Sequence, residues 1–149
     1  MVTDLEQYER RFRDHFGSPA EVVVRAPGRA EVIGGHTDYN DGWVLPMAID
    51  RECLMLLCRR RDPQVCVFSE LFGEECRFEL TGALAPGEPA WVNYAKGVAA
   101  LLLRAGRPLV GVDLYVASDI PLGGGLSSSA ALEVGYARCF LAAVDEGFD

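Results

Sequence analysis

Lysine is almost missing from this chain, in which Lys96 is the only one among fourteen basic residues. Acidic residues number 22, and the formal net charge is -8 with a pI near 4.7. A surface of this sign excludes general nucleic-acid binders and proteins that dock on acidic membranes, because both need an excess of positive charge. Any anionic ligand would have to be held by backbone amides, arginine and a divalent cation.

Long apolar runs are missing as well. No stretch reaches the roughly 20 residues that a membrane-spanning helix needs. An acidic, polar segment follows Met1, where a signal peptide would have an apolar core. We therefore expect a cytoplasmic location, with neither a membrane nor a nucleic acid as partner.

The cysteines show no pattern that would build a site. They are five in number, which is odd, and none is spaced as C-x-x-C, so a disulfide framework or a metal site is disfavoured. Each lies in an apolar stretch: Cys53, Cys58, Cys66, Cys76 and Cys139. The sequence predicts buried thiols in a reducing compartment.

The order of patterned segments predicts an α+β fold with one core. A capping box at Thr3 to Glu6 begins a helix that Gly17 and Pro19 end. Further helices are expected at 91–103 and 127–144. Strands are expected at 21–25, at 75–80, at 110–117, and in three pieces between 43 and 69 that are interrupted near 50–52 and 62–63.

The most informative segment is a glycine-rich run between the expected strand at 110–117 and the last helix. Residues 121–131 read PLGGGLSSSAA. Contiguous glycines let backbone N–H groups turn toward an anion, and the serines stand at the positive end of the helix. The run is neither a Walker A loop, because no lysine follows, nor a dinucleotide fingerprint, because its glycines are not spaced as G-x-G-x-x-G. A flexible connection is the alternative, but the run is short and patterned segments flank it on both sides.

A second constellation lies near the N-terminus. Residues 26–47 read APGRAEVIGGHTDYNDGWVLPM and gather Arg29, His36, Asp38, Tyr39 and Asn40. Together the two segments resemble the sugar-kinase superfamily of galactokinase, homoserine kinase, mevalonate kinase and phosphomevalonate kinase, known as GHMP kinases. Within it they resemble galactokinases, whose signature reads roughly G-R-x-N-x-I-G-E-H-T-D-Y-N-x-G-x-V-L-P. Residues 28–46 match this signature in order.

The resemblance implies a mixed sheet with helices packed on it and ATP- and Mg-dependent phosphorylation of galactose, or a close hexose relative, at the anomeric hydroxyl. It implies that Arg29 stabilises charge during phosphoryl transfer. Gly35, His36, Thr37 and Asp38 would then bind the sugar. The nucleotide would bind at Ser69 and at the run Gly123, Gly124, Gly125, Leu126, Ser127, Ser128 and Ser129, with Ser129 also a ligand of Mg.

Each role has a simpler alternative. Arg29 could form a surface ion pair, Asp38 could only shape a turn, and His36 could make a structural hydrogen bond. Either Ser127 or Ser128 could cap the last helix, and Ser69 could simply end a strand.

Two positions depart from the signature. Gly35 stands where the family has Glu, and Glu31 stands where the family commonly has Asn. The first departure removes a carboxylate expected to bind a sugar hydroxyl, which indicates a changed substrate, a weakened enzyme or a decayed gene. Restoring the acid with Gly35→Glu is expected to lower the Michaelis constant for galactose.

The expected domain covers residues 1–149, with the signature at 26–47 and the phosphate loop at 121–131. Gly147 is expected to end the last helix. The resemblance implies three further parts that are expected to be absent: the aspartate that acts as catalytic base, a glutamate that helps hold Mg, and the C-terminal domain that completes the cleft. The isolated chain should therefore not turn over. The alternatives are a non-catalytic galactose and ATP sensor that acts as a regulatory co-inducer, and a remnant without ligands. An exposed apolar face would favour self-association.

Overall fold

A computed structural model describes residues 4–35, 37–80 and 83–144. Its elements are α1 (Leu5–Phe16), β1 (Val22–Ile33), the short 3₁₀ turn η1 (Asp38–Asn40), β2 (Leu45–Arg59), β3 (Gln64–Ser69), β4 (Glu74–Glu79), the short 3₁₀ turn η2 (Ala90–Val92), α2 (Asn93–Arg104), β5 (Val112–Ser118) and α3 (Ser128–Ala143). The α+β class expected from the sequence is confirmed.

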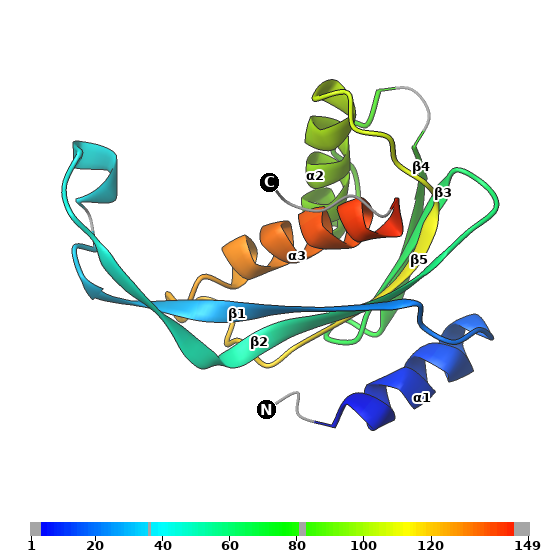
Figure 1. Ribbon diagram of the computed structural model, residues 1–149, viewed down its shortest axis with the longest axis horizontal. Coiled ribbons are helices and arrows are strands. Elements are labelled where there is room, and N and C mark those ends of the chain that lie inside the picture. Colours follow the sequence, from blue (N-terminus) through cyan, green and yellow to red (C-terminus); the bar gives the residue numbers. More distant parts are fainter. Residues whose placement is uncertain (1–3, 36, 81–82, 145–149) are drawn as a thin grey trace.

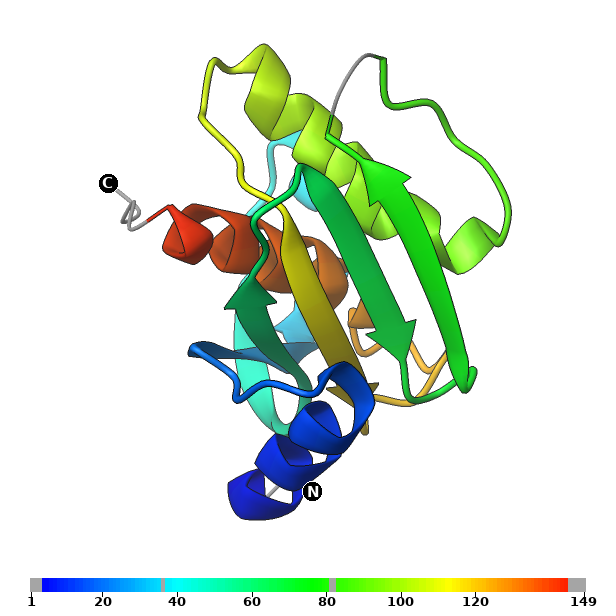
Figure 2. The same cartoon turned by 90° about the vertical axis from the view of Figure 1, so that its right-hand side faces the viewer.

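One five-stranded sheet organises the chain, in the order β1-β2-β5-β3-β4. β3 and β5 are parallel, and the other neighbours are antiparallel, so the sheet is mixed. Helices α2 and α3 cover one face, and α1 lies against the other (Figure 1). The same arrangement is visible in the view turned by 90° (Figure 2).

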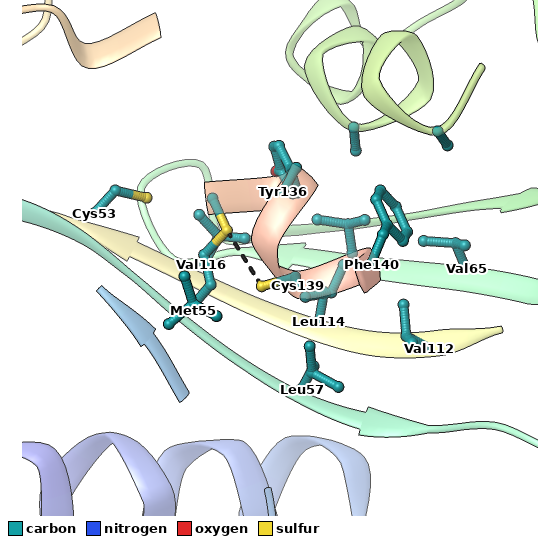
Figure 3. Close-up of a cluster of buried hydrophobic side chains, with 14 of the residues drawn as sticks. Cys53, Met55, Leu57, Val65, Val112, Leu114, Val116, Tyr136, Cys139 and Phe140 are labelled. Carbon is teal, nitrogen blue, oxygen red and sulfur yellow. Dashed lines mark hydrogen bonds between the residues drawn. The ribbon is translucent and has the colours of Figure 1, made fainter. Parts of the chain in front are cut away.

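Side chains of β2 and β5 contribute alternately to two hydrophobic cores, one on each face of the sheet, because successive residues of a strand point to opposite faces. In β2, Cys53, Met55 and Leu57 point toward α3, whereas Leu54, Leu56 and Cys58 face α1. Figure 3 shows the first set and their β5 neighbours around Tyr136, Cys139 and Phe140 of α3.

Helix α3 approaches the sheet closely at Gly135. A Cβ at this position would lie 2.8 Å from Met55 Cε, so a larger residue would force the end of the Met55 side chain to move. One turn further on, Cys139 Sγ donates to Met55 Sδ at 3.8 Å. The helix is thereby fixed on β2, and its first turn, which follows the glycine run, has a defined position.

Helix α1 begins one residue later than the predicted capping box implies. Asp4 is the N-cap, and its carboxylate accepts from the backbone N–H of Gln7 at 3.1 Å. Thr3 lies outside the described residues. The helix ends at Gly17, which has φ of 76° as the sequence predicts for a C-cap, and Phe12 is fully buried beneath it.

Two strand predictions are wrong in extent. The sequence predicts an interruption near 50–52, but β2 continues through it, although its pairing with β1 shifts register there, between the pairs Pro27–Glu52 and Arg29–Ala48. Glu52 also forms a charged pair with Arg25 of β1 at 2.6 Å. The strand expected at 21–25 continues to Ile33. The signature segment is therefore the arm of a long hairpin, and Arg29 lies on a strand. The interruption near 62–63 is confirmed.

The far end of the β1–β2 hairpin exposes large apolar side chains. Trp43 is 96% exposed, and Ile33, Tyr39, Leu45 and Met47 are each more than half exposed. This is the surface through which self-association would occur, and self-association stays a prediction. Within the described residues, no helix is long and apolar enough to cross a membrane.

Candidate functional site

The glycine run forms a tight bend between β5 and α3. Gly123 and Gly125 have φ of 71° and 68°, which glycine adopts at no steric cost, and Ser127 has φ of 61°. A serine in this left-handed region stores strain, a feature that concentrates at functional sites. The bend is an ordered turn and not a slack connection.

Backbone N–H groups in the bend are available to a ligand. Within the described part of the chain, no backbone N–H between Asp119 and Ala131 donates to a backbone carbonyl. The Ala131 N–H donates to the Ser127 carbonyl at 3.0 Å. Ser127 occupies the N-cap position of α3, but its side chain makes no capping hydrogen bond. The positive end of the helix is therefore open to an anion.

Aspartate 119 anchors the entrance to the bend. Its carboxylate accepts from the Glu52 backbone N–H at 2.8 Å and from Arg51 Nη1 at 3.3 Å. Partial burial alone would raise the pKa of Asp119, but these hydrogen bonds outweigh it and hold that pKa below its ordinary value. The next turn is fixed too, since the Ile120 N–H donates to Ser118 Oγ at 3.2 Å.

A cavity of about 290 Å³ opens beside the bend. It is lined by Ser69 at the end of β3 and by Ser128 and Ser129 in the first turn of α3. Ser69 is only 7% exposed. Three of the serines predicted from the sequence thus come together from segments about 60 residues apart, whereas Gly123 to Ser127 lie outside the lining of this cavity.

An aromatic wall, formed by Phe72, Trp91 and Tyr94, completes the cavity. Phe72 and Trp91 are stacked with ring centroids 5.9 Å apart and planes at 18°, and Trp91 Nε1 donates to Glu74 at 3.2 Å. Such a wall offers an apolar surface to a flat, partly apolar ring. Sequence reasoning missed all three residues. The one available signal was the spacing of Trp91 and Tyr94, which puts them on one face at the start of a helix.

Ser129 meets this wall through a hydrogen bond. Its Oγ lies 2.9 Å from Tyr94 Oη, a contact that joins the first turns of α2 and α3. The hydroxyl proposed to reach Mg therefore has a fixed orientation at the edge of the cavity.

Arg29 brings the signature strand against the bend. Its backbone N–H donates to the Leu126 carbonyl at 3.0 Å, and a Cβ on Gly28 would lie 3.0 Å from the same oxygen. The Arg29 side chain is 53% exposed, with Nε 3.7 Å from Glu31 Oε2. It also borders a second cavity, of about 320 Å³, that Ser127 and Arg138 line between β1 and α3.

Two sequence signatures match these segments. The galactokinase galactose-binding signature matches residues 10–59, which include the hairpin arm with Arg29. The GHMP kinases N terminal domain matches residues 93–149, which include the glycine bend and α3.

Curated relatives agree with the signatures. The galactokinase of Chloroflexus aurantiacus is 49% identical over 137 residues, 92% of this chain and 35% of the relative. Human galactokinase is 44% identical over 137 residues, 87% of this chain and 34% of the relative. The chain belongs to the galactokinase family. It corresponds to the N-terminal part and spans about a third of the length of these curated galactokinases.

Solved structures share the fold. A galactokinase from Lactococcus lactis, crystallised in complex with galactose, aligns with a TM-score of 0.85 at 31% identity over 99% of this chain and 39% of its own. The mevalonate kinase of Methanococcus jannaschii aligns with a TM-score of 0.74 at 16% identity over 86% of this chain and 42% of its own. The second similarity shows the fold alone.

The galactokinase signature places its polar residues in the turn of the hairpin. His36 lies outside the described residues, and Asp38 begins η1. Thr37 Oγ1 donates to the carbonyls of Gly34 at 2.7 Å and Trp43 at 2.9 Å, and so closes the turn. This contact is structural. The sugar-binding roles of these residues stay predictions.

The two departures from the galactokinase signature lie next to each other. A Cβ on Gly35 would be 3.8 Å from Glu31 Cγ, with no other described neighbour within 4 Å. Glu31 Oε1 is buried and has no hydrogen-bond partner. Such an atom typically costs about 1–3 kcal/mol of stability.

The five cysteines are all free, and four of them are buried, as predicted. Cys76 is the exception in burial, because it lies on the exposed edge strand β4 and is only partly covered.

Proposed function

We propose that this chain forms the nucleotide- and sugar-binding part of an ATP- and Mg-dependent kinase that phosphorylates galactose, or a close hexose relative, at the anomeric hydroxyl. One observation carries the proposal: the hydrogen bond from Arg29 N–H to the Leu126 carbonyl joins the galactose-binding signature to the glycine bend. Phosphoryl transfer requires both substrates to be held in contact, and the segments that would bind them are adjacent.

The nucleotide would lie across the bend and the 290 Å³ cavity. Amides of Gly123, Gly124 and Gly125 and the start of α3 would bind its phosphates, while Ser69 and the Phe72–Trp91 pair would hold the rest. This use of backbone amides fits a chain whose single lysine, Lys96, lies elsewhere on α2.

Magnesium would bind with the nucleotide, through the Ser129 hydroxyl and phosphate oxygens. The fit rests on that hydroxyl, which Tyr94 holds at the cavity edge. Among the described residues, no three His, Cys, Asp or Glu side chains gather as metal ligands. When bound, the cation would neutralise negative charge on the phosphates.

The sugar would lie between Arg29 and the turn of the hairpin. Arg29 would stabilise charge on the transferring phosphoryl group, and Gly35, His36, Thr37 and Asp38 would surround the sugar hydroxyls. The catalytic base and a second Mg ligand would come from the part of a galactokinase that this chain does not span, so the 149 residues alone would bind without turnover. The free thiols support a reducing compartment, the cytoplasm.

A chimera tests this function. Residues 1–144 would be joined to the remaining part of the Chloroflexus aurantiacus galactokinase and assayed for ATP-dependent galactose phosphorylation. We expect activity in the chimera and none in the 149-residue chain. Arg29→Gln should lower kcat by about 10²–10³-fold, whereas Arg104→Gln, at the exposed end of α2, should not change it.

Other outcomes would contradict the proposal. A chimera that binds galactose and ATP without turnover would favour the sensor function. A chimera that binds neither ligand would leave a structural remnant. Unchanged kcat in Arg29→Gln would remove Arg29 from the catalytic step.

A further inference from the structure

We propose that Glu31 supplies the carboxylate that binds a sugar hydroxyl in this chain, in place of the Glu that the galactokinase signature carries at position 35. The inference rests on the proposed function and deepens it, because it names a residue that determines sugar affinity.

The first observation is position. Glu31 lies near the end of β1, and Gly35 lies just after that strand. A Cβ at position 35 would be 3.8 Å from Glu31 Cγ, and no other described atom comes within 4 Å of it. A side chain at position 35 would therefore begin in van der Waals contact with that of Glu31, whose carboxylate carbon, Cδ, is one bond from Cγ.

The second observation is the unmatched oxygen. Glu31 Oε1 is buried without a hydrogen-bond partner, although the side chain as a whole is 24% exposed. The Glu31 Oε2 atom lies 3.7 Å from Arg29 Nε, which is too long for a hydrogen bond. Buried acceptors are nearly always satisfied, so this carboxylate has an unused acceptor. A sugar hydroxyl is a donor of the right kind.

The two departures then explain each other. The chain loses a carboxylate at position 35 and gains one at position 31, within contact distance of the same space. The proposal also alters the expectation for Gly35→Glu, because a second carboxylate would meet Glu31 and be repelled by it.

Four variants test the inference by galactose titration of the 149-residue chain, followed by amide NMR. We expect Glu31→Gln and Glu31→Asn to weaken galactose binding at least tenfold. The double variant Glu31→Asn with Gly35→Glu restores the family pattern and should return affinity to within about threefold of the original chain. Gly35→Glu alone should give no gain. Glu6→Gln, on the exposed start of α1, is the control for loss of one negative charge.

The rescue separates binding from structure, because a merely structural role for Glu31 would not be recovered by an acid at position 35. Thermal melting of each variant checks folding. Full galactose affinity in both Glu31 variants, or no rescue in the double variant, would overturn the inference and leave the proposed function standing. No galactose binding by the original chain would overturn both.

Discussion

The backbone N–H of Arg29 donates to the carbonyl oxygen of Leu126 at 3.0 Å, and this bond connects two segments almost a hundred residues apart in sequence. Gly28 permits it. A Cβ there would approach the Leu126 carbonyl and Ile49 Cδ1 to 3.0 Å each, closer than most Cβ contacts. The register between hairpin and bend therefore depends on a residue without a side chain.

Gly28→Ala should consequently weaken both stability and nucleotide binding. We expect a loss of about 1 kcal/mol in the free energy of unfolding, since the carbonyl must shift by a few tenths of an ångström. Mg-ATP affinity should fall with it. Gly97→Ala is the matched control, because a Cβ at Gly97 meets nothing within 4 Å, and it should stabilise α2 by about 0.5–1 kcal/mol. Equal behaviour of the two variants in urea unfolding and calorimetry would contradict this account of the contact.

The hydrogen bond between Tyr94 and Ser129 predicts coupling between helices α2 and α3 at the 290 Å³ cavity. Tyr94→Phe keeps the ring and removes the hydroxyl, so Ser129 loses its fixed orientation. We expect Mg-ATP affinity to fall about three- to tenfold, roughly the effect of one hydrogen bond.

A double-mutant cycle measures this coupling. Adding Tyr94→Phe to Ser129→Ala should cost little more than Ser129→Ala alone, because the hydroxyl that Tyr94 orients is then already gone. Tyr115→Phe is the control, since the Tyr115 hydroxyl donates to Glu70 on the opposite face of the sheet. Fully additive effects would show that the two hydroxyls act independently.

Asp119 predicts a pH-dependent contribution to stability. Folding lowers the pKa of this carboxyl from the ordinary 3.8, so the native chain takes up the proton less readily than the unfolded chain. Its stabilisation is therefore complete well above pH 4 and is lost as the pH falls through the lowered pKa.

Asp119→Ala should cost about 1–3 kcal/mol near pH 7, because the Glu52 amide loses its acceptor. The difference from the original chain should shrink near pH 3. Asp119→Asn, which keeps an acceptor oxygen but no charge, should lie between the two. Urea unfolding at both pH values measures the free-energy difference between the Asp119→Ala variant and the original chain. A difference that grows in acid would contradict a lowered pKa for Asp119.

Thiol reactivity tests the core. Burial raises the pKa of Cys53 and of Cys66 to about 12, so neither forms a thiolate at pH 8. With Ellman's reagent, one thiol should react quickly in the native chain, and five should react after denaturation. Cys76→Ser should remove the fast phase. Rapid reaction of several native thiols would mean that the helices do not cover the two faces of the sheet as described.

Much of this fold could be predicted because its signals are local. The glycine run, the Gly17 cap and the break at Asp62–Pro63 are each encoded by a few adjacent residues. The continuity of β2 could not be predicted, because Asp50, Arg51 and Glu52 read as a polar interruption until the ion pair between Glu52 and Arg25 of the neighbouring strand β1 is known.

The site divides in the same way. The signature and the glycine bend are evident as sequence motifs. The aromatic wall depends on a contact between Phe72 and Trp91, two residues whose spacing in the sequence predicts no contact. The Glu31–Gly35 proximity was also hidden. In the sequence, Glu31 and Gly35 are two separate departures from the signature. Only the path of the chain after β1 brings them into contact.

The most direct test of the account is an amide NMR titration of the 149-residue chain with Mg-ATP. We expect saturable shifts at Gly123, Gly124, Gly125, Ser128 and Ser129, accompanied by Ser69 and the Trp91 indole. Shifts that bypass these amides, or no shifts at millimolar nucleotide, would contradict the claim that the bend beside Arg29 binds a triphosphate.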